Sequence, residues 1–88
     1  MYDRVRSARR KIVGARQVLR AIEQGEPIAV VVAEDAAKDI TLPLVEKAKA
    51  RGIPVHTVES MQELGRAAGI DVAASVVAIP AEAADRPT

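Results

Sequence analysis

The chain has 88 residues, of which 49% are apolar, so it can form one compact domain with a core and has no room for a second. It contains no cysteine, which excludes disulfides, thiolate metal ligands and a cysteine nucleophile, and its longest apolar run, residues 28–33, is far too short to cross a bilayer. The formal net charge of +1 results from an uneven distribution of charge along the chain. Residues 1–20 carry seven basic residues and one acidic residue, whereas residues 21–88 carry six basic and eleven acidic residues. We therefore expect residues 1–20 to lie near a polyanion, unless they form only a solvated basic face.

Hydrophobic periodicity predicts an alternation of helices and strands along the chain. Gly25 is a natural residue after a helix C-terminus, and Pro27 opens a β-branched run that is typical of a strand buried on both faces. Thr41 followed by Pro43 indicates a helix N-terminus, and Gly52 ends that helix. The expected elements are a helix over residues 3–11, a strand over 12–13, a helix over 15–24, a strand over 28–33, a helix over 41–51, a strand over 55–58, a helix over 60–69 and a strand over 75–79.

The last expected helix begins with a capping box, in which Ser60 is the N-cap and Glu63 is the third helical residue. Because helices and strands alternate, we expect an α/β fold in which helices cover both faces of one sheet. Residues 1–79 should form the domain. Residues 80–88 are rich in alanine, proline and acidic residues, and we expect them to form a disordered tail.

The start of the second helix is the first candidate site. Gly14 at the strand–helix junction allows a ligand to approach the backbone, and the free N–H groups that follow from Ala15 onward favour phosphate. Arg16 and Arg20 are four residues apart and share one edge of the helix, with Gln17 beside them. An arginine fork fits either a guanine edge or a phosphate, and glutamine can read a base edge. The alternative is an ordinary amphipathic helix with a polar outer face.

The loop over residues 70–74 is the second candidate site. Gly65, just before it, has no rationale inside a helix unless another segment packs closely against it. Ile70 and Val72 are aliphatic where a connection is usually polar. Such side chains can cover the face of an unstacked base. The alternative, which is favoured for Ile70, is that they point into the core.

Catalytic and metal sites find little support in the sequence. The phosphate-cradling glycine loops and the serine-nucleophile motif do not occur in it. His56 lies inside an expected strand with no acid or nucleophile beside it, which indicates a structural or surface residue. Glu34 and Asp35 follow a strand but are too few for a metal site, so we expect them to begin a turn from which they can also reach RNA ribose or amino groups. We expect no enzymatic activity, no metal and no cofactor.

The scarcity of aromatic residues restricts the kind of nucleic-acid binder that the chain can be. Proteins that read single strands on a sheet surface need stacking aromatic rings, and this chain has only Tyr2. The composition therefore favours recognition of a folded RNA shape, or of a bulge, by arginine, glutamine, backbone and aliphatic groups.

These residues together resemble the L7Ae ribosomal protein family, in its short bacterial YbxF-like branch. The resemblance extends from about Tyr2 to Ile79, and the Leu64-Gly-x-x-x-Gly69 segment, Gly14 and the Ala33-Glu-Asp turn make it specific. The matching stretches are residues 12–22, 30–36, 52–55, 58–69 and 76–79.

The resemblance implies a three-layer α-β-α sandwich with a four-stranded mixed sheet, and binding to kink-turn RNA, a helix–bulge–helix element with tandem sheared G·A pairs. Archaeal members of the family usually carry Asn-Glu where this chain has Arg16 and Gln17, whereas YbxF-like proteins carry a basic residue and Gln at these positions. Because the base-contacting pair differs from the archaeal one, two roles stay open for Arg16. It either reads guanine or only neutralises phosphate. By this implication, the residues that face the G·A stem and its phosphates are Lys11, Gly14, Arg16, Gln17 and Arg20, and those under the extruded bulge nucleotide are Ile70, Val72 and Ala73.

We therefore expect a monomeric, cytoplasmic and ribosome-associated ribonucleoprotein component that binds structured RNA, with ribosomal RNA among the candidates, and binds neither DNA nor a membrane. The start of the chain, basic and without an apolar segment, indicates no signal peptide. The alternative is a protein-interaction module whose basic N-terminal helices dock an acidic partner.

Overall fold

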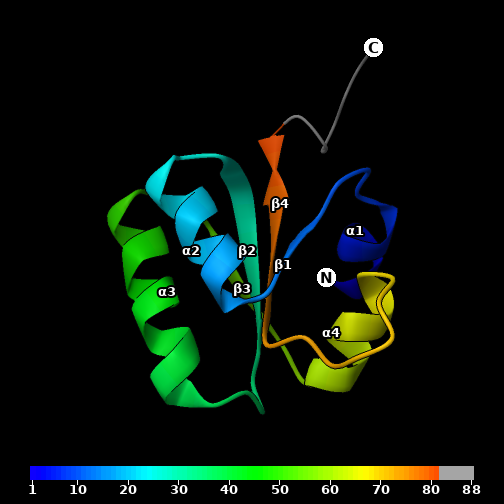
Figure 1. The fold of residues 1–88 in the computed structure, drawn as a ribbon. Coiled ribbons are helices and arrows are strands. Elements are labelled where there is room, and N and C mark those ends of the chain that lie inside the picture. The colour runs from blue at the N-terminus through cyan, green and yellow to red at the C-terminus, as the bar shows by residue number, and fades with distance from the viewer. Residues whose placement is uncertain (82–88) are drawn as a thin grey trace.

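A computed structural model of the protein describes residues 1–81 and shows helices and strands in strict alternation (Figure 1). The elements are α1 (Tyr2–Ser7), β1 (Ile12–Val13), α2 (Ala15–Glu23), β2 (Pro27–Ala33), α3 (Lys38–Ala50), β3 (Val55–Val58), α4 (Met61–Ala67) and β4 (Val76–Pro80).

The strands form one mixed sheet in the order β1-β4-β2-β3. β2 pairs with β3 in parallel, whereas β4 is antiparallel to both β1 and β2. β2 and β4 are central and buried along almost their whole length, and the β-branched run of residues 28–33 predicts this burial for β2. The predicted α/β class with a four-stranded mixed sheet is confirmed.

The side-chain alternation of the two central strands builds a separate core on each face of the sheet. Val30 and Val76 point to the face covered by α2 and α3, where they pack with Val18, Ile22 and Leu44. The neighbouring residues Val31 and Val77 point to the opposite face, where the buried partners are Val5 of α1 and Leu64 of α4. Helices thus cover both faces, which gives three layers (Figure 1). Full burial of each such aliphatic side chain stabilises the fold by about 1.5–3 kcal/mol.

Two helices differ from their predicted bounds by three residues or more at one end. α1 ends at Ser7 instead of continuing to residue 11, because Ala8 is extended (φ −65°, ψ 136°) and the chain must turn there to pair Ile12 with Ala78 of β4. α3 begins at Lys38, so Thr41 lies inside the helix and is not its N-cap. The carbonyl of Ala37 accepts the N–H groups of residues 40 and 41, which forms the first turn without a side-chain cap.

The C-terminal end of the described chain continues the sheet by one residue more than the sequence indicates. Pro80 is buried and ends β4, and the N–H of Ala81 donates to the carbonyl of Glu26 at 3.1 Å. The rest of the expected tail, residues 82–88, lies outside the described residues.

Candidate nucleic-acid interface

One end of the sheet brings together the two segments that the sequence singles out. The N–H of Gly14, at the start of α2, donates to the carbonyl of Val76 at 3.1 Å. The N–H of Ala33, at the end of β2, donates to the carbonyl of Ser75 at 2.9 Å. The start of α2, the turn after β2 and the loop between α4 and β4 therefore meet at the same sheet end, which is the lower end in Figure 1.

The start of α2 is open to solvent and basic. Gly14 occupies the N-cap position with φ +99°, where it provides no side-chain cap for the first N–H groups of the helix. Arg16, Gln17 and Arg20 are exposed. Within residues 1–81, neither arginine makes a hydrogen bond or an ion pair. Both guanidinium groups are therefore available to an external anion.

The other predicted residues on this side differ in their accessibility. Lys11 precedes β1 and is half-buried, as is Ala15 in the first turn of α2. Glu34 is exposed at the end of β2, where its N–H donates to the carbonyl of Val58 at 2.7 Å and its carbonyl accepts the Nζ of Lys38 at 3.2 Å. Glu34 and Asp35 thus begin the turn between β2 and α3, as predicted.

The loop after α4 rests on Gly65. A Cβ at this position would overlap the carbonyl oxygen of Val72 and would lie 3.0 Å from its carbonyl carbon and 3.1 Å from the Cα of Ala73. The loop is further fixed by the N–H of Ala74, which donates to the carbonyl of Met61 at 3.0 Å. The close packing that the sequence required at Gly65 is therefore confirmed.

The two aliphatic residues of the loop have different surroundings. Ile70 is half-buried and packs against the core between α1, α4 and the sheet, as the favoured alternative predicted. Val72 retains 68% of its accessible surface, and Ala73 is also exposed. The loop thus presents apolar side chains to solvent beside the start of α4.

A hollow of about 580 Å³ lies between this loop, the start of α4 and the turn after β2. Three predicted residues line it, and they are Ile70, Val72 and Ala73. The other lining residues, which the sequence does not indicate, are Asp35, Ser60, Met61, Gln62, Arg66 and Asp71. The hollow has the aliphatic loop as one wall and the polar start of α4 as another.

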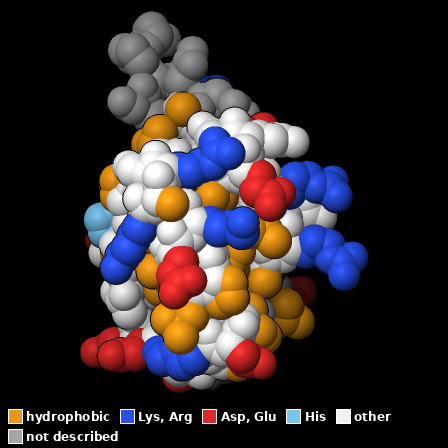
Figure 2. Space-filling view, turned by 90° about the vertical axis from the view of Figure 1, so that its left-hand side faces the viewer, with side chains coloured by type: hydrophobic (Ala, Val, Ile, Leu, Met, Phe, Trp, Pro, Cys, Tyr) orange, Lys and Arg blue, Asp and Glu red, His pale blue; other side chains and the backbone are white. Residues whose placement is uncertain are grey.

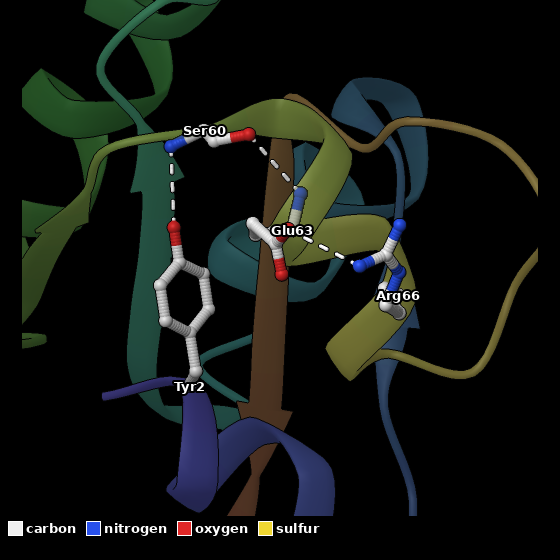
Figure 3. Close-up of polar contacts among 4 residues, drawn as sticks. All are labelled: Tyr2, Ser60, Glu63 and Arg66. Atoms are coloured by element: carbon white, nitrogen blue, oxygen red, sulfur yellow. Dashed lines mark hydrogen bonds and ion pairs between the residues drawn. The ribbon is translucent and has the colours of Figure 1, made fainter.

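Hydrogen bonds hold the start of α4 in place (Figure 3). The predicted capping interaction is present, because the Oγ of Ser60 accepts the N–H of Glu63 at 3.1 Å, while the Glu63 carboxylate turns to the guanidinium of Arg66 at 3.2 Å. The N–H of Ser60 donates to the hydroxyl of Tyr2 at 3.2 Å, which links α1 to α4. The N–H of Met61 donates to a carboxylate oxygen of Asp35 at 2.8 Å.

The capping box is the sequence signal for the wall of the hollow that the start of α4 forms. It locates the start of α4 but not the turn against which that start packs, because Asp35 and Met61 are 26 residues apart in the sequence and are brought together by the fold.

His56 is half-buried in β3. Residues 1–81 contain no cluster of His, Cys, Asp or Glu that could hold a metal ion. None of the helices in this part of the chain has the length and apolar character to cross a membrane.

Comparison with protein families finds a match to the family described as "Ribosomal protein L7Ae/L30e/S12e/Gadd45 family" over residues 2–85. A curated relative from Geobacillus stearothermophilus, named RNA-binding protein YbxF, is 42% identical over 82 residues, which are 89% of this chain and 95% of the relative. The large ribosomal subunit protein eL8 of Halobacterium salinarum is 41% identical over 69 residues, 77% of this chain and 58% of that protein.

Solved structures agree with this match. The Giardia lamblia 15.5kD RNA binding protein superposes with a TM-score of 0.82 at 27% identity, covering 90% of this chain and 69% of that one. A protein of unknown function from Bacillus halodurans superposes with a TM-score of 0.78 at 29% identity, covering 90% and 79% of the two chains.

Proposed function

Because the chain belongs to the ribosomal protein L7Ae/L30e/S12e/Gadd45 family, we propose that it is an RNA-binding protein that acts without catalysis. The names of its relatives support this proposal, since the YbxF protein of Geobacillus stearothermophilus and the 15.5kD protein of Giardia lamblia are both named as RNA-binding. The single observation that carries it is the meeting of a basic helix start and an apolar loop at one end of the sheet.

The RNA that fits this surface is a kinked, bulged duplex of the kink-turn type. A helix start with exposed Arg16, Gln17 and Arg20 offers forked donors and positive charge to paired bases and phosphates. The neighbouring hollow, with exposed Val72 on its rim, offers an apolar wall to a base that has left its stack. A straight duplex has no unstacked base to place there, so the two features together favour a bent RNA with a bulge.

The relationship to a large-subunit ribosomal protein supports association with ribosomal RNA, and we place the protein in the cytoplasm on the same grounds. A monomer suffices for this function, since both halves of the surface come from one chain.

The decisive experiment titrates the protein with a kink-turn RNA and with the same RNA in which the G·A pairs are changed to Watson–Crick pairs. We expect the altered RNA to bind at least about tenfold more weakly, which corresponds to about 1.4 kcal/mol. Equal affinity for the two RNAs would refute kink-turn recognition. Absence of measurable binding to either RNA, together with partners that co-purify after RNase treatment, would favour the protein-interaction alternative.

A further inference from the structure

The start of α4 has a modified capping box, in which one of the two usual hydrogen bonds is made by another residue. In a capping box the third helical residue, here Glu63, directs its carboxylate back to the N–H of the N-cap residue, here Ser60. In this protein the N–H of Ser60 donates instead to the hydroxyl of Tyr2, at 3.2 Å. The other bond is present, since the Oγ of Ser60 accepts the N–H of Glu63 at 3.1 Å. A side chain from α1 thus takes the place that the Glu63 carboxylate usually fills.

The Glu63 carboxylate holds Arg66 instead. Its Oε2 lies 3.2 Å from a guanidinium nitrogen of Arg66, and Figure 3 shows these contacts as one chain from Tyr2 to Arg66. Within residues 1–81 the structure gives Arg66 no other partner. Ser60 and Arg66 lie three residues before and after Glu63, which is about 4.5 Å toward opposite ends of the helix. A Glu63 carboxylate that turned back to the N-cap would therefore release Arg66.

Arg66 has a distinct place in the hollow beside the loop over residues 70–74. Among the described residues that line this hollow, Arg66 is the only basic one, and Asp35 and Asp71 are acidic. Its side chain retains 67% of its accessible surface, so a ligand can reach it while Glu63 holds it. A nucleotide that enters the hollow brings a phosphate, which the two carboxylates repel and the guanidinium attracts. The placement of Arg66 therefore matters for binding there.

We propose that Tyr2 is a positioning residue for the RNA-binding surface. By occupying the N–H of Ser60, its hydroxyl keeps the Glu63 carboxylate on Arg66, and the guanidinium is held in place for the nucleotide in the hollow. The inference rests on the proposed function and adds a contribution of α1 to it. A guanidinium that is already held loses less conformational freedom on binding than one on a free side chain. Without the hydroxyl, the N–H of Ser60 would lose its acceptor, and the Glu63 carboxylate would turn back to it.

The first test concerns the exchange of acceptors at Ser60 and needs no RNA. Tyr2→Phe removes only the hydroxyl and keeps the ring, which packs against the core between α1, α4 and the sheet. Glu63→Ala removes the group that would replace this hydroxyl. Each single variant then leaves the N–H of Ser60 with an acceptor, and the double variant leaves it with none. We expect the melting temperature of the double variant to fall by about 3 °C or more beyond the sum of the two single shifts. Additive shifts would overturn the exchange.

The second test asks whether Arg66 transmits the effect of Tyr2 to RNA. Tyr2→Phe should weaken binding to a kink-turn RNA about threefold to tenfold, which is the scale expected when one long side chain has to be ordered on binding. In an Arg66→Ala background the same substitution should change the affinity by less than about twofold, because the two residues act in one chain of contacts. Losses of equal size in both backgrounds would mean that Tyr2 supports the fold without acting through Arg66, and would overturn the proposal.

Glu63→Ala provides a third comparison, with Glu46→Ala as its matched control. Both substitutions remove one exposed carboxylate and change the net charge equally. Glu46 lies on α3, which packs on the opposite face of the sheet from α4, and basic and acidic side chains are interspersed on that side of the molecule (Figure 2). Loss of a carboxylate by itself favours binding of a polyanion. We expect Glu63→Ala to weaken RNA binding nevertheless, as Tyr2→Phe does. Affinity equal to that of the Glu46→Ala variant would contradict the anchoring of Arg66.

Failure of this inference can be told apart from failure of the proposed function. If the wild type bound the G·A and the Watson–Crick RNA equally, kink-turn recognition would fall, and the role of Tyr2 in it would fall as well. If the wild type distinguished the two RNAs while either cycle of variants gave additive effects, the positioning role of Tyr2 alone would be overturned.

Discussion

Replacing Gly65 with alanine would place a methyl group where the carbonyl of Val72 now lies. At an unhindered helical position, glycine to alanine stabilises a protein by about 0.5–1 kcal/mol, because alanine loses less backbone entropy on folding. Here the contacted atoms belong to backbone, which cannot rotate away as a flexible side chain can. The carbonyl oxygen of Val72, which the methyl group would overlap, would have to move away, together with the carbonyl carbon of Val72 at 3.0 Å and the Cα of Ala73 at 3.1 Å.

Overpacking of this kind usually costs about 1–3 kcal/mol, which exceeds the gain in helix propensity. We therefore expect Gly65→Ala to lower the free energy of unfolding by about 1–2 kcal/mol. For a domain of this size the melting temperature should fall by about 4–8 °C for each kcal/mol. The same displacement moves Val72 and Ala73, so affinity for a kink-turn RNA should fall even below the melting transition.

The sign of the stability change makes this experiment decisive. Chemical denaturation with urea gives the free energy of unfolding, and a gel-shift titration at the same temperature gives the affinity. A Gly65→Ala variant that is as stable as the wild type, or more stable, would mean that the loop gives way without cost. The close packing would then not position the loop.

Three further predictions concern the two halves of the surface. Arg16→Ala and Arg20→Ala should each weaken RNA binding by about 1–3 kcal/mol, measured by gel shift, and full affinity of both variants would remove α2 from the interface. Val72→Asp should leave the melting temperature nearly unchanged, because Val72 is exposed, and should weaken binding by placing a negative charge beside the RNA; an unchanged dissociation constant would show that the loop does not touch it. Asp35→Ala should lower stability by about 1 kcal/mol, since the N–H of Met61 loses its acceptor, and a melting curve that superposes on that of the wild type would contradict this.

Local signals in the sequence sufficed for most of the fold. The β-branched run after Pro27 located β2, Gly25 marked the end of α2, and the Ser60 capping box located α4. Each of these depends on neighbours within a few residues, which a sequence displays directly.

The errors arose where distant segments decide the local structure. The basic residues after Ser7 are compatible with a helix, but the pairing of Ile12 with Ala78 requires the chain to turn before it. Thr41 has the chemistry of an N-cap, yet its side chain is buried and donates to the carbonyl of Ala37 inside α3. Neither tertiary requirement can be read from the residues next to it.

The candidate site also has one part that the sequence indicates and another part that only the fold brings together. Gly14, Arg16 and Arg20 could be assigned from their order in the sequence, because one helix start presents them together. The polar wall of the hollow could not be assigned from the sequence, since Asp35 and Arg66 come from separate elements. Which of the predicted residues contact RNA stays a prediction.

The link between Tyr2 and Ser60 has a practical consequence for solution studies. The protein contains no tryptophan and a single tyrosine, so all of its intrinsic fluorescence arises from one phenol ring. That ring is tied through its hydroxyl to a residue that lines the hollow. A ligand settling there would perturb one emitter at a known location, which gives a label-free optical signal with no background from elsewhere in the chain.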